Sequence, residues 1–273
     1  MPRLITLLIL ALALVVGWPI RPANAVIEPE DPEQLYEQGL RQMKRGYYDE
    51  AILNFEKVRN HFPFNKYSVL SELRVADCLF EKAAFLEAVD AYRQFARLHP
   101  RHPEIDYAVY RTARAEFKLA PTVAQRDQAH TRLGLRHIGD FESRFPESEY
   151  LDEVDRLRFK ANRRLARAAT QIGNFYWKQR KWSAAERRYG QSAEAFPAAP
   201  TAGKARYRRA LAQWKLGRYA DARVGLAALA AEDPEGRWGQ RAVSYLASHP
   251  EGSEPAPEAT DVEAPTDEVA PTP

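Results

Sequence analysis

The sequence predicts an all-α protein in which antiparallel helix pairs stack into a solenoid with a right-handed superhelical twist. Apolar residues recur at helical spacing from residue 33 to about residue 247. Five stretches share one order of small, aromatic and turn-forming residues, and each ends near a proline. A single helix pair cannot bury its own apolar face, so the repetition indicates that neighbouring pairs pack on one another.

The clearest copy of this pattern lies within residues 33–63. We expect its first helix to stop at Gly46, because glycine commonly ends helices. Small side chains at Gly39 and Ala51 would let the two helices approach closely, and Phe55 would fill the space around them. This combination of small and aromatic positions is typical of the tetratricopeptide repeat.

Four further copies follow, of which the third is degenerate and carries an insert around residues 119–127. We place the five repeats at residues 33–63, 68–100, 106–146, 166–197 and 203–234 of a repeat domain over residues 33–247. An additional helix is predicted over residues 150–170. We expect it to join two halves of the solenoid, either running into the fourth repeat or standing just before it.

The first 25 residues resemble a secretory signal peptide. Arg3 precedes an apolar run over residues 4–16, and an Ala-Asn-Ala sequence closes the segment. The run is shorter than the roughly 20 residues that a membrane-spanning helix needs. We therefore expect cleavage after Ala25, which leaves Val26 where a lipoprotein signal would have a cysteine. Residues 26–32 then form a short lead-in.

The two ends of the chain differ in charge from the part between them. Residues 250–273 carry seven acidic side chains and no basic one, and their Pro-rich, polar composition predicts a disordered tail. Between residues 26 and 249, 38 basic side chains face 30 acidic ones, a net charge of +8. This excess favours acidic partner surfaces or anionic headgroups. No recognised nucleic-acid-binding motif accompanies it, so we expect no nucleic-acid partner.

The sequence does not predict an active site. It contains no Gly-rich phosphate loop, G-x-S-x-G or H-E-x-x-H sequence. His99 and His102 have a spacing that could bind a metal, but prolines mark this segment as a turn between repeats, and no further ligands accompany them. Cys78 lies within a predicted helix, where we expect it to be buried. We expect neither enzyme activity nor a cofactor or metal, and an enzyme or metal protein is the alternative class.

The first helix of each repeat is expected to line a concave groove that binds peptides. In the third repeat this register selects Tyr107, Tyr110, Arg114 and Phe117, with Lys118 beside them. The other predicted groove residues are Tyr36, Leu40, Leu73, Asp77 and Phe80. Three aromatic and two cationic side chains on one helix face suit an extended peptide with aromatic side chains. The alternative is that about half of these residues pack on the neighbouring helix.

Several stretches resemble the BamD (ComL) family, the tetratricopeptide-repeat subunit of the outer-membrane β-barrel assembly machinery. They are LYEQGLRQMKRGYYDEAILNFEKV at 35–58, FPFNKY at 62–67, FARLHPRHPEIDYAVYRTA at 95–113, RDQAHTR at 126–132, RFPESEY at 144–150 and RLARAATQIGNFYWKQRKW at 164–182. The resemblance extends over about residues 33–247. It departs from the family at Val26, where the family has a lipidated cysteine, and in the acidic tail.

The resemblance implies a non-enzymatic periplasmic scaffold that is peripheral on the inner face of the outer membrane. The amino-terminal half would receive segments of unfolded outer-membrane proteins, including their last strand. The carboxy-terminal half would dock on a POTRA domain of the barrel-forming subunit. Alignment on Trp182 places a docking arginine of the family at Arg188, with Arg187 beside it. The alternative is another periplasmic repeat scaffold, such as a Tol–Pal or cell-division coordinator, although no heptads precede Leu35 here.

Overall fold

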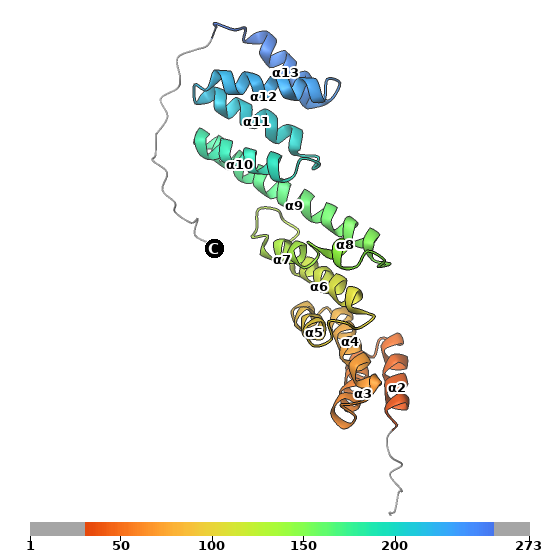
Figure 1. Ribbon diagram of the computed structural model, residues 1–273. Helices are drawn as coiled ribbons and strands as arrows, with labels where there is room; N and C mark the ends of the chain where they lie inside the picture. The colour runs from red at the N-terminus through yellow and green to blue at the C-terminus, as the bar shows by residue number, and fades with distance from the viewer. Residues whose placement is uncertain (1–30, 254–273) are drawn as a thin grey trace, which may run out of the picture.

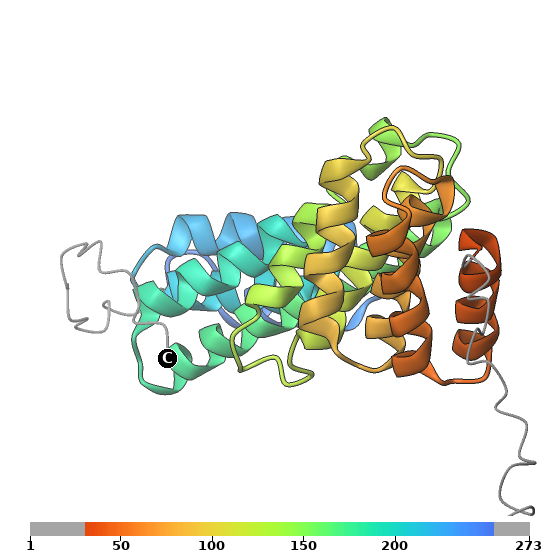
Figure 2. The ribbon, with the colours of Figure 1, turned by 90° about the horizontal axis from the view of Figure 1, so that it is seen from below.

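The computed structural model describes residues 31–253, and within this part every regular element is a helix. With the labels of Figure 1, the helices are α2 (Pro32–Lys44), α3 (Tyr48–His61), α4 (Lys66–Glu81), α5 (Phe85–Leu98), α6 (Ile105–Leu119), α7 (Ala129–His137), α8 (Phe141–Arg144), α9 (Leu151–Lys178), α10 (Trp182–Ala195), α11 (Ala202–Lys215), α12 (Tyr219–Glu232) and α13 (Arg237–Ser248). The helices form an elongated stack that runs from α2 to α13 (Figures 1 and 2).

Helices that follow one another in sequence pack against one another along the stack. Pairs α2/α3, α4/α5, α9/α10 and α11/α12 each make one repeat, α6 pairs with the shorter α7 and α8, and α13 covers α12 at the end. This arrangement confirms the predicted all-α solenoid of tetratricopeptide repeats. The predicted signal segment and nearly all of the acidic tail lie outside the described residues.

A residue in the left-handed conformation closes the turn inside four of these helix pairs. Gly46 and Gly217 have φ values of +82° and +74°, which glycine adopts without steric cost. Ala83 and Arg180 take the equivalent places after α4 and α9 with φ of 62° and 59°. In each turn the next N–H donates to a carbonyl five residues back, which satisfies the end of the first helix.

Glycines allow the two helices of a repeat to approach closely, as the sequence predicted. A Cβ placed on Gly39 of α2 would lie 2.6 Å from the ring of Phe55 on α3. In the fourth repeat, a Cβ on Gly173 would lie 2.7 Å from the ring of Tyr189. Both rings are fully buried, so they have little room to move away. These contacts determine how closely the helices of each pair pack.

The third repeat and the helix after it depart most from the regular pattern. Residues 120–128 form a loop in place of a tight turn, and α7 and α8 stand where one long helix would be. α9 is a single helix of 28 residues that contains both the predicted extra helix and the first helix of repeat four. It packs against α6, α7 and α8 as well as α10 and α11, and so joins the two halves. No helix between residues 31 and 253 has the length and apolar character needed to span a bilayer.

Candidate functional site

Five of the nine predicted groove residues have buried side chains. Their exposed fractions range from 0% to 8%, and they are Leu73, Asp77, Phe80, Tyr110 and Tyr36. The first helices pack on both the preceding and following helices, which covers much of the face that the register assigned to a groove. Their burial agrees with the alternative that about half of the predicted residues pack on a neighbouring helix, although Tyr110 also lines a surface groove.

Asp77 is the centre of a buried polar network between α4, α5 and α6. Its carboxylate accepts hydrogen bonds from the hydroxyls of Tyr92 at 2.5 Å and Tyr107 at 2.7 Å, and from Arg74 at 2.8 Å. Burial raises the pKa of Asp77, and Arg74 and the two hydroxyls oppose that rise. Burial and the nearby carboxylate also raise the pKa of Tyr92 and of Tyr107, so both hydroxyls remain protonated donors.

Arg111 connects this network to the aromatic side chains around it. It donates to the Tyr92 hydroxyl at 2.9 Å and to Glu81 at 3.1 Å. Its guanidinium also lies 4.0 Å from the centre of the Phe80 ring, a favourable cation–π distance. The predicted groove residues Asp77 and Phe80 thus belong to the buried core between α4, α5 and α6, and not to an exposed groove surface.

A surface groove of about 360 Å³ lies between α6 and the first half of α9. From α6 it is lined by three predicted residues, Tyr110, Arg114 and Phe117, together with Lys118. The residues that α9 contributes are Glu153, Arg156, Leu157 and Lys160. We call this the α6–α9 groove. It combines an aromatic and apolar surface with four cations and one carboxylate.

Two aromatic side chains of the α6–α9 groove pack on other residues within the solenoid. Tyr110 stacks on Tyr150 with ring centres 5.0 Å apart, and its hydroxyl accepts from Arg114 at 3.3 Å. The Phe117 ring packs at Gly134 of α7, where an added Cβ would come within 2.9 Å of it. Tyr110 and Phe117 therefore support the fold as well as line the groove.

The cations of the α6–α9 groove are only partly neutralised. Arg156 pairs with Glu153 at 3.2 Å, within α9 itself. Among residues 31–253, Arg114, Lys118 and Lys160 have no carboxylate within ion-pair distance. The groove thus presents an excess of positive charge beside aromatic rings.

Sequence reasoning missed the contribution of α9 because the groove crosses between two repeats. A signal was present, since Arg156 and Lys160 are one helical turn apart and Leu157 lies beside them. The remaining predicted residues lie elsewhere. Tyr107 is half-buried with its hydroxyl on Asp77, and Leu40 packs at the edge of the core formed by α2, α3 and α4.

The predicted docking arginines lie on α10 in the second half. Arg187 is exposed, and Arg188 is half-buried and donates to Gln191 Oε1 at 3.1 Å. Among the described residues neither arginine has an acidic partner. Both side chains therefore have charge available for a partner.

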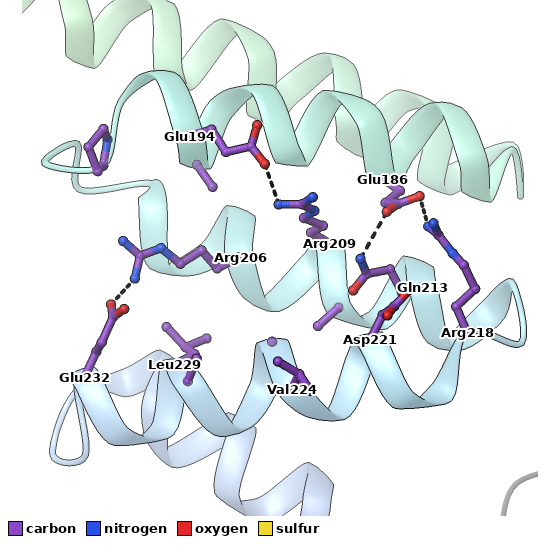
Figure 3. A pocket seen from close by; sticks show the side chains of 15 residues that line it. Glu186, Glu194, Arg206, Arg209, Gln213, Arg218, Asp221, Val224, Leu229 and Glu232 are labelled. Carbon is purple, nitrogen blue, oxygen red and sulfur yellow. Dashed lines mark hydrogen bonds and ion pairs between the residues drawn. The ribbon is translucent and has the colours of Figure 1, made fainter.

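A second groove, of about 750 Å³, lies on another side of α10, between α10, α11 and α12. Figure 3 shows arginines reaching from α11 and the following turn to carboxylates on α10 and α12. The ion pairs are Arg206–Glu232, Arg209–Glu194 and Arg218–Glu186. Neither Arg187 nor Arg188 lines this groove. Its arginines are already paired within the chain, which distinguishes it from the α6–α9 groove.

The two histidines with metal-ligand spacing have hydrogen-bond partners within the chain, and Cys78 is buried. His99 hydrogen bonds to Glu72 at 3.0 Å, and His102 Nδ1 accepts from the N–H of Glu104. Cys78 is fully buried as predicted, and burial raises the pKa of its thiol to about 12. A thiol with such a pKa is not a nucleophile at neutral pH.

Known proteins resemble this chain over most of its length. The outer membrane protein assembly factor BamD of Rickettsia prowazekii is 28% identical over 218 residues, which cover 80% of this chain and 86% of the relative. BamD of Caulobacter vibrioides is 28% identical over 213 residues, covering 78% and 70%. Among solved structures, the TPR2AB-domain:pHSP90-complex of yeast Sti1 aligns with a TM-score of 0.43 and 17% identity, over 80% of this chain and 86% of that one.

A family model described as YfiO, outer membrane lipoprotein, matches residues 28–224. The match includes the α6–α9 groove, the buried Asp77 network and helix α10. Since it spans well over half of the chain, and the relatives named above are BamD proteins, this chain belongs to the BamD family of outer membrane assembly factors.

Proposed function

We propose that this protein is a non-enzymatic scaffold in the assembly of outer-membrane β-barrel proteins, acting at the periplasmic side of that membrane. The names of its relatives support this role, and the signal-like residues 1–25 support export. Repeat solenoids bind other proteins along extended surfaces, and the two halves of this one offer different surfaces. We assign one half to substrate binding and the other to docking.

The α6–α9 groove is the surface that we assign to substrate. The observation that carries this assignment is the excess of cations beside Tyr110, Phe117 and Leu157. A segment of an unfolded barrel protein that ends in an aromatic residue has a ring for the apolar surface and a terminal carboxylate for the cations. We expect Arg114 of α6 and Lys160 of α9, which line the groove from its two helices, to share that carboxylate.

Binding of a fluorescent peptide that ends in phenylalanine tests this assignment. Replacing Arg114 and Lys160 by alanine should weaken binding at least tenfold, about 1.4 kcal/mol. Blocking the peptide's carboxylate as an amide should have a similar effect. Cations are the better probes because Tyr110 and Phe117 also pack inside the solenoid, so their removal would mix binding with folding.

Arg163→Ala is the matched control, since Arg163 is exposed on the same helix but does not line the groove. Binding that is equal in the wild type and the Arg114→Ala/Lys160→Ala variant would contradict the assignment. Equal binding of the free and amidated peptides would show that the cations do not hold the terminal carboxylate.

Helix α10 is the surface that we assign to docking on a POTRA domain of the barrel-forming subunit. Arg188 is half-buried, so its stem can lie on the helix while its guanidinium reaches outward. A guanidinium can hold a carboxylate through two parallel hydrogen bonds, which a lysine cannot reproduce. We therefore expect an acidic residue on the partner opposite Arg188, with Arg187 as the neighbouring alternative.

A further inference from the structure

A row of cations continues along α9 beyond the α6–α9 groove. Arg156, Lys160, Arg164 and Arg167 follow one another at intervals of four, four and three residues, which places them on one face of the helix. We call these four residues the α9 stripe. Arg156 pairs with Glu153, but within residues 31–253 no carboxylate pairs with the other three. Like charges one turn apart destabilise a helix, so an unneutralised row is costly.

Unpaired polar atoms mark the same face of α9. The Nη1 atom of Arg164 is buried without a hydrogen-bond partner in the described part of the chain. The Oε1 atom of Gln171, seven residues further along α9, is in the same state. Buried polar groups in folded proteins nearly always have partners, and within residues 31–253 these two atoms have none.

The carboxy-terminal segment of this chain has the complementary charge. Seven acidic side chains lie between Glu251 and Glu268, and residues 250–273 contain no basic one. The same segment has six prolines, and proline-rich segments favour extended chain that presents its side chains outward. Its charge therefore fits a row of cations on a helix surface.

The acidic segment is long enough to reach the α9 stripe. It follows α13, and α11 contacts both α13 and α9, so where α11 separates them the axes of α9 and α13 lie up to about 20 Å apart. The stripe from Arg156 to Arg167 extends about 17 Å along α9. The 18 residues from Pro250 to Asp267 can span about 55–60 Å when extended. The extended segment is therefore longer than the distance to the α9 stripe and along it, so it can follow a curved path over the surface.

We propose that the acidic segment over residues 251–268 binds the α9 stripe of its own chain. The contact covers the three cations of α9 that have no carboxylate among the described residues, and it reaches the edge of the α6–α9 groove at Lys160. It does not depend on the binding of any barrel-protein segment. An acidic partner protein or an anionic lipid surface would be a different occupant of the same face.

Zero-length cross-linking of the full chain with a carbodiimide tests this proposal, because it joins a lysine to a carboxylate only where the two touch. In low salt, Lys160 should link to acids of residues 258–268 within one molecule, at least fivefold more than the exposed Lys44 of α2. Arg164→Glu/Arg167→Glu should reduce this link at least fivefold while leaving Lys160 in place. Arg41→Glu/Arg45→Glu at the carboxy-terminal end of α2 changes the net charge equally and should leave the link unchanged.

A second variant tests the same contact without altering the helix stack. Neutralising the tail by Glu258→Gln/Asp261→Asn/Glu263→Gln should also reduce the Lys160 link at least fivefold, with unchanged circular dichroism. The proposal is overturned if the link is absent, if the Arg164→Glu/Arg167→Glu variant retains it, or if it forms only between molecules. Binding of vesicles with 30% phosphatidylglycerol through the stripe, without the Lys160 link, would assign this face to lipid and overturn it too.

Discussion

One arginine–carboxylate pair in the first half of the solenoid is buried, whereas a pair that lines the groove in the second half is exposed. In the first half the side chains of Arg111 and Asp77 are 9% and 2% exposed, whereas in the second half those of Arg209 and Glu194 are 38% and 66% exposed. Water screens the second pair and is excluded from the first. The buried ion pair therefore contributes to the stability of the packing between α4, α5 and α6. The exposed pairs that line the groove of Figure 3 orient surface side chains and contribute little to stability.

Removing the acidic residue of each pair tests this difference most directly. It also has the largest expected effect on the free energy of unfolding. Asp77→Ala leaves Arg74 and Arg111 buried without their shared carboxylate, and we expect the free energy of unfolding to fall by about 3–5 kcal/mol. Glu194→Ala removes a screened partner of Arg209, for which we expect less than about 1 kcal/mol. Urea denaturation followed by circular dichroism measures both. Equal losses in the two variants would contradict the distinction by depth.

Arg188 extends the comparison to an arginine whose proposed partner lies on another protein. Arg188→Glu should weaken the complex with the POTRA domain by about 2–5 kcal/mol if the ion pair is buried on docking. It should leave the circular dichroism of the isolated protein unchanged, because its neighbour Gln191 is exposed. Calorimetric titration with the POTRA domain measures the loss.

A charge-reversed residue on the partner should restore binding to the Arg188→Glu protein. Arg209→Glu is the control. Arg209 of α11 already pairs with Glu194 and lines the groove between α10, α11 and α12, away from Arg188. If Arg188→Glu binds as the wild type does, docking does not use this side chain. Arg187, about 100° further round the helix, is then the next residue to test.

The close helix contacts should be similar in the two halves, in contrast to the ion pairs. Gly39→Ala and Gly173→Ala each push a Cβ into a fully buried ring, and we expect each to lower the free energy of unfolding by about 1–3 kcal/mol. Gly225→Ala on α12 is the control. Its Cβ would meet Ala210 at an ordinary 3.6 Å, so there alanine should stabilise the helix slightly. A loss at Gly225 as large as at Gly39 would show that helix propensity, not packing, governs these sites.

The smallest effect concerns the turn in the fourth repeat. Arg180 holds a left-handed conformation that costs a residue with a Cβ about 1–2 kcal/mol. Arg180→Gly should therefore raise the free energy of unfolding, by about 1 kcal/mol after the greater chain entropy of glycine is subtracted. The reverse change at Gly217, which has the same conformation, should lower it. The thermal midpoint of each variant would show the sign, and a lower midpoint for Arg180→Gly would contradict this explanation of the turn.

The sequence alone determined the repeat fold, because local rules establish it. Helical spacing of apolar residues, the turn at Gly46 and the pairing of Gly39 with Phe55 all act within some thirty residues of chain. Each repeats in later copies, which makes the pattern readable without any tertiary information. The burial of Cys78 was predicted on other grounds, because a lone thiol in an oxidising compartment is normally buried.

Only the tertiary structure decided which of the predicted groove residues reach the surface. A helix in a solenoid touches the helix before it and the helix after it, so a helical register cannot tell the face that lines a groove from the face that a neighbour covers. Asp77 and Phe80 lie beneath Arg111 of the next repeat, and Tyr110 and Arg114 line one groove with Lys160 only because α9 packs beside α6. Contacts between residues thirty to fifty positions apart fix these outcomes, and no local pattern encodes them.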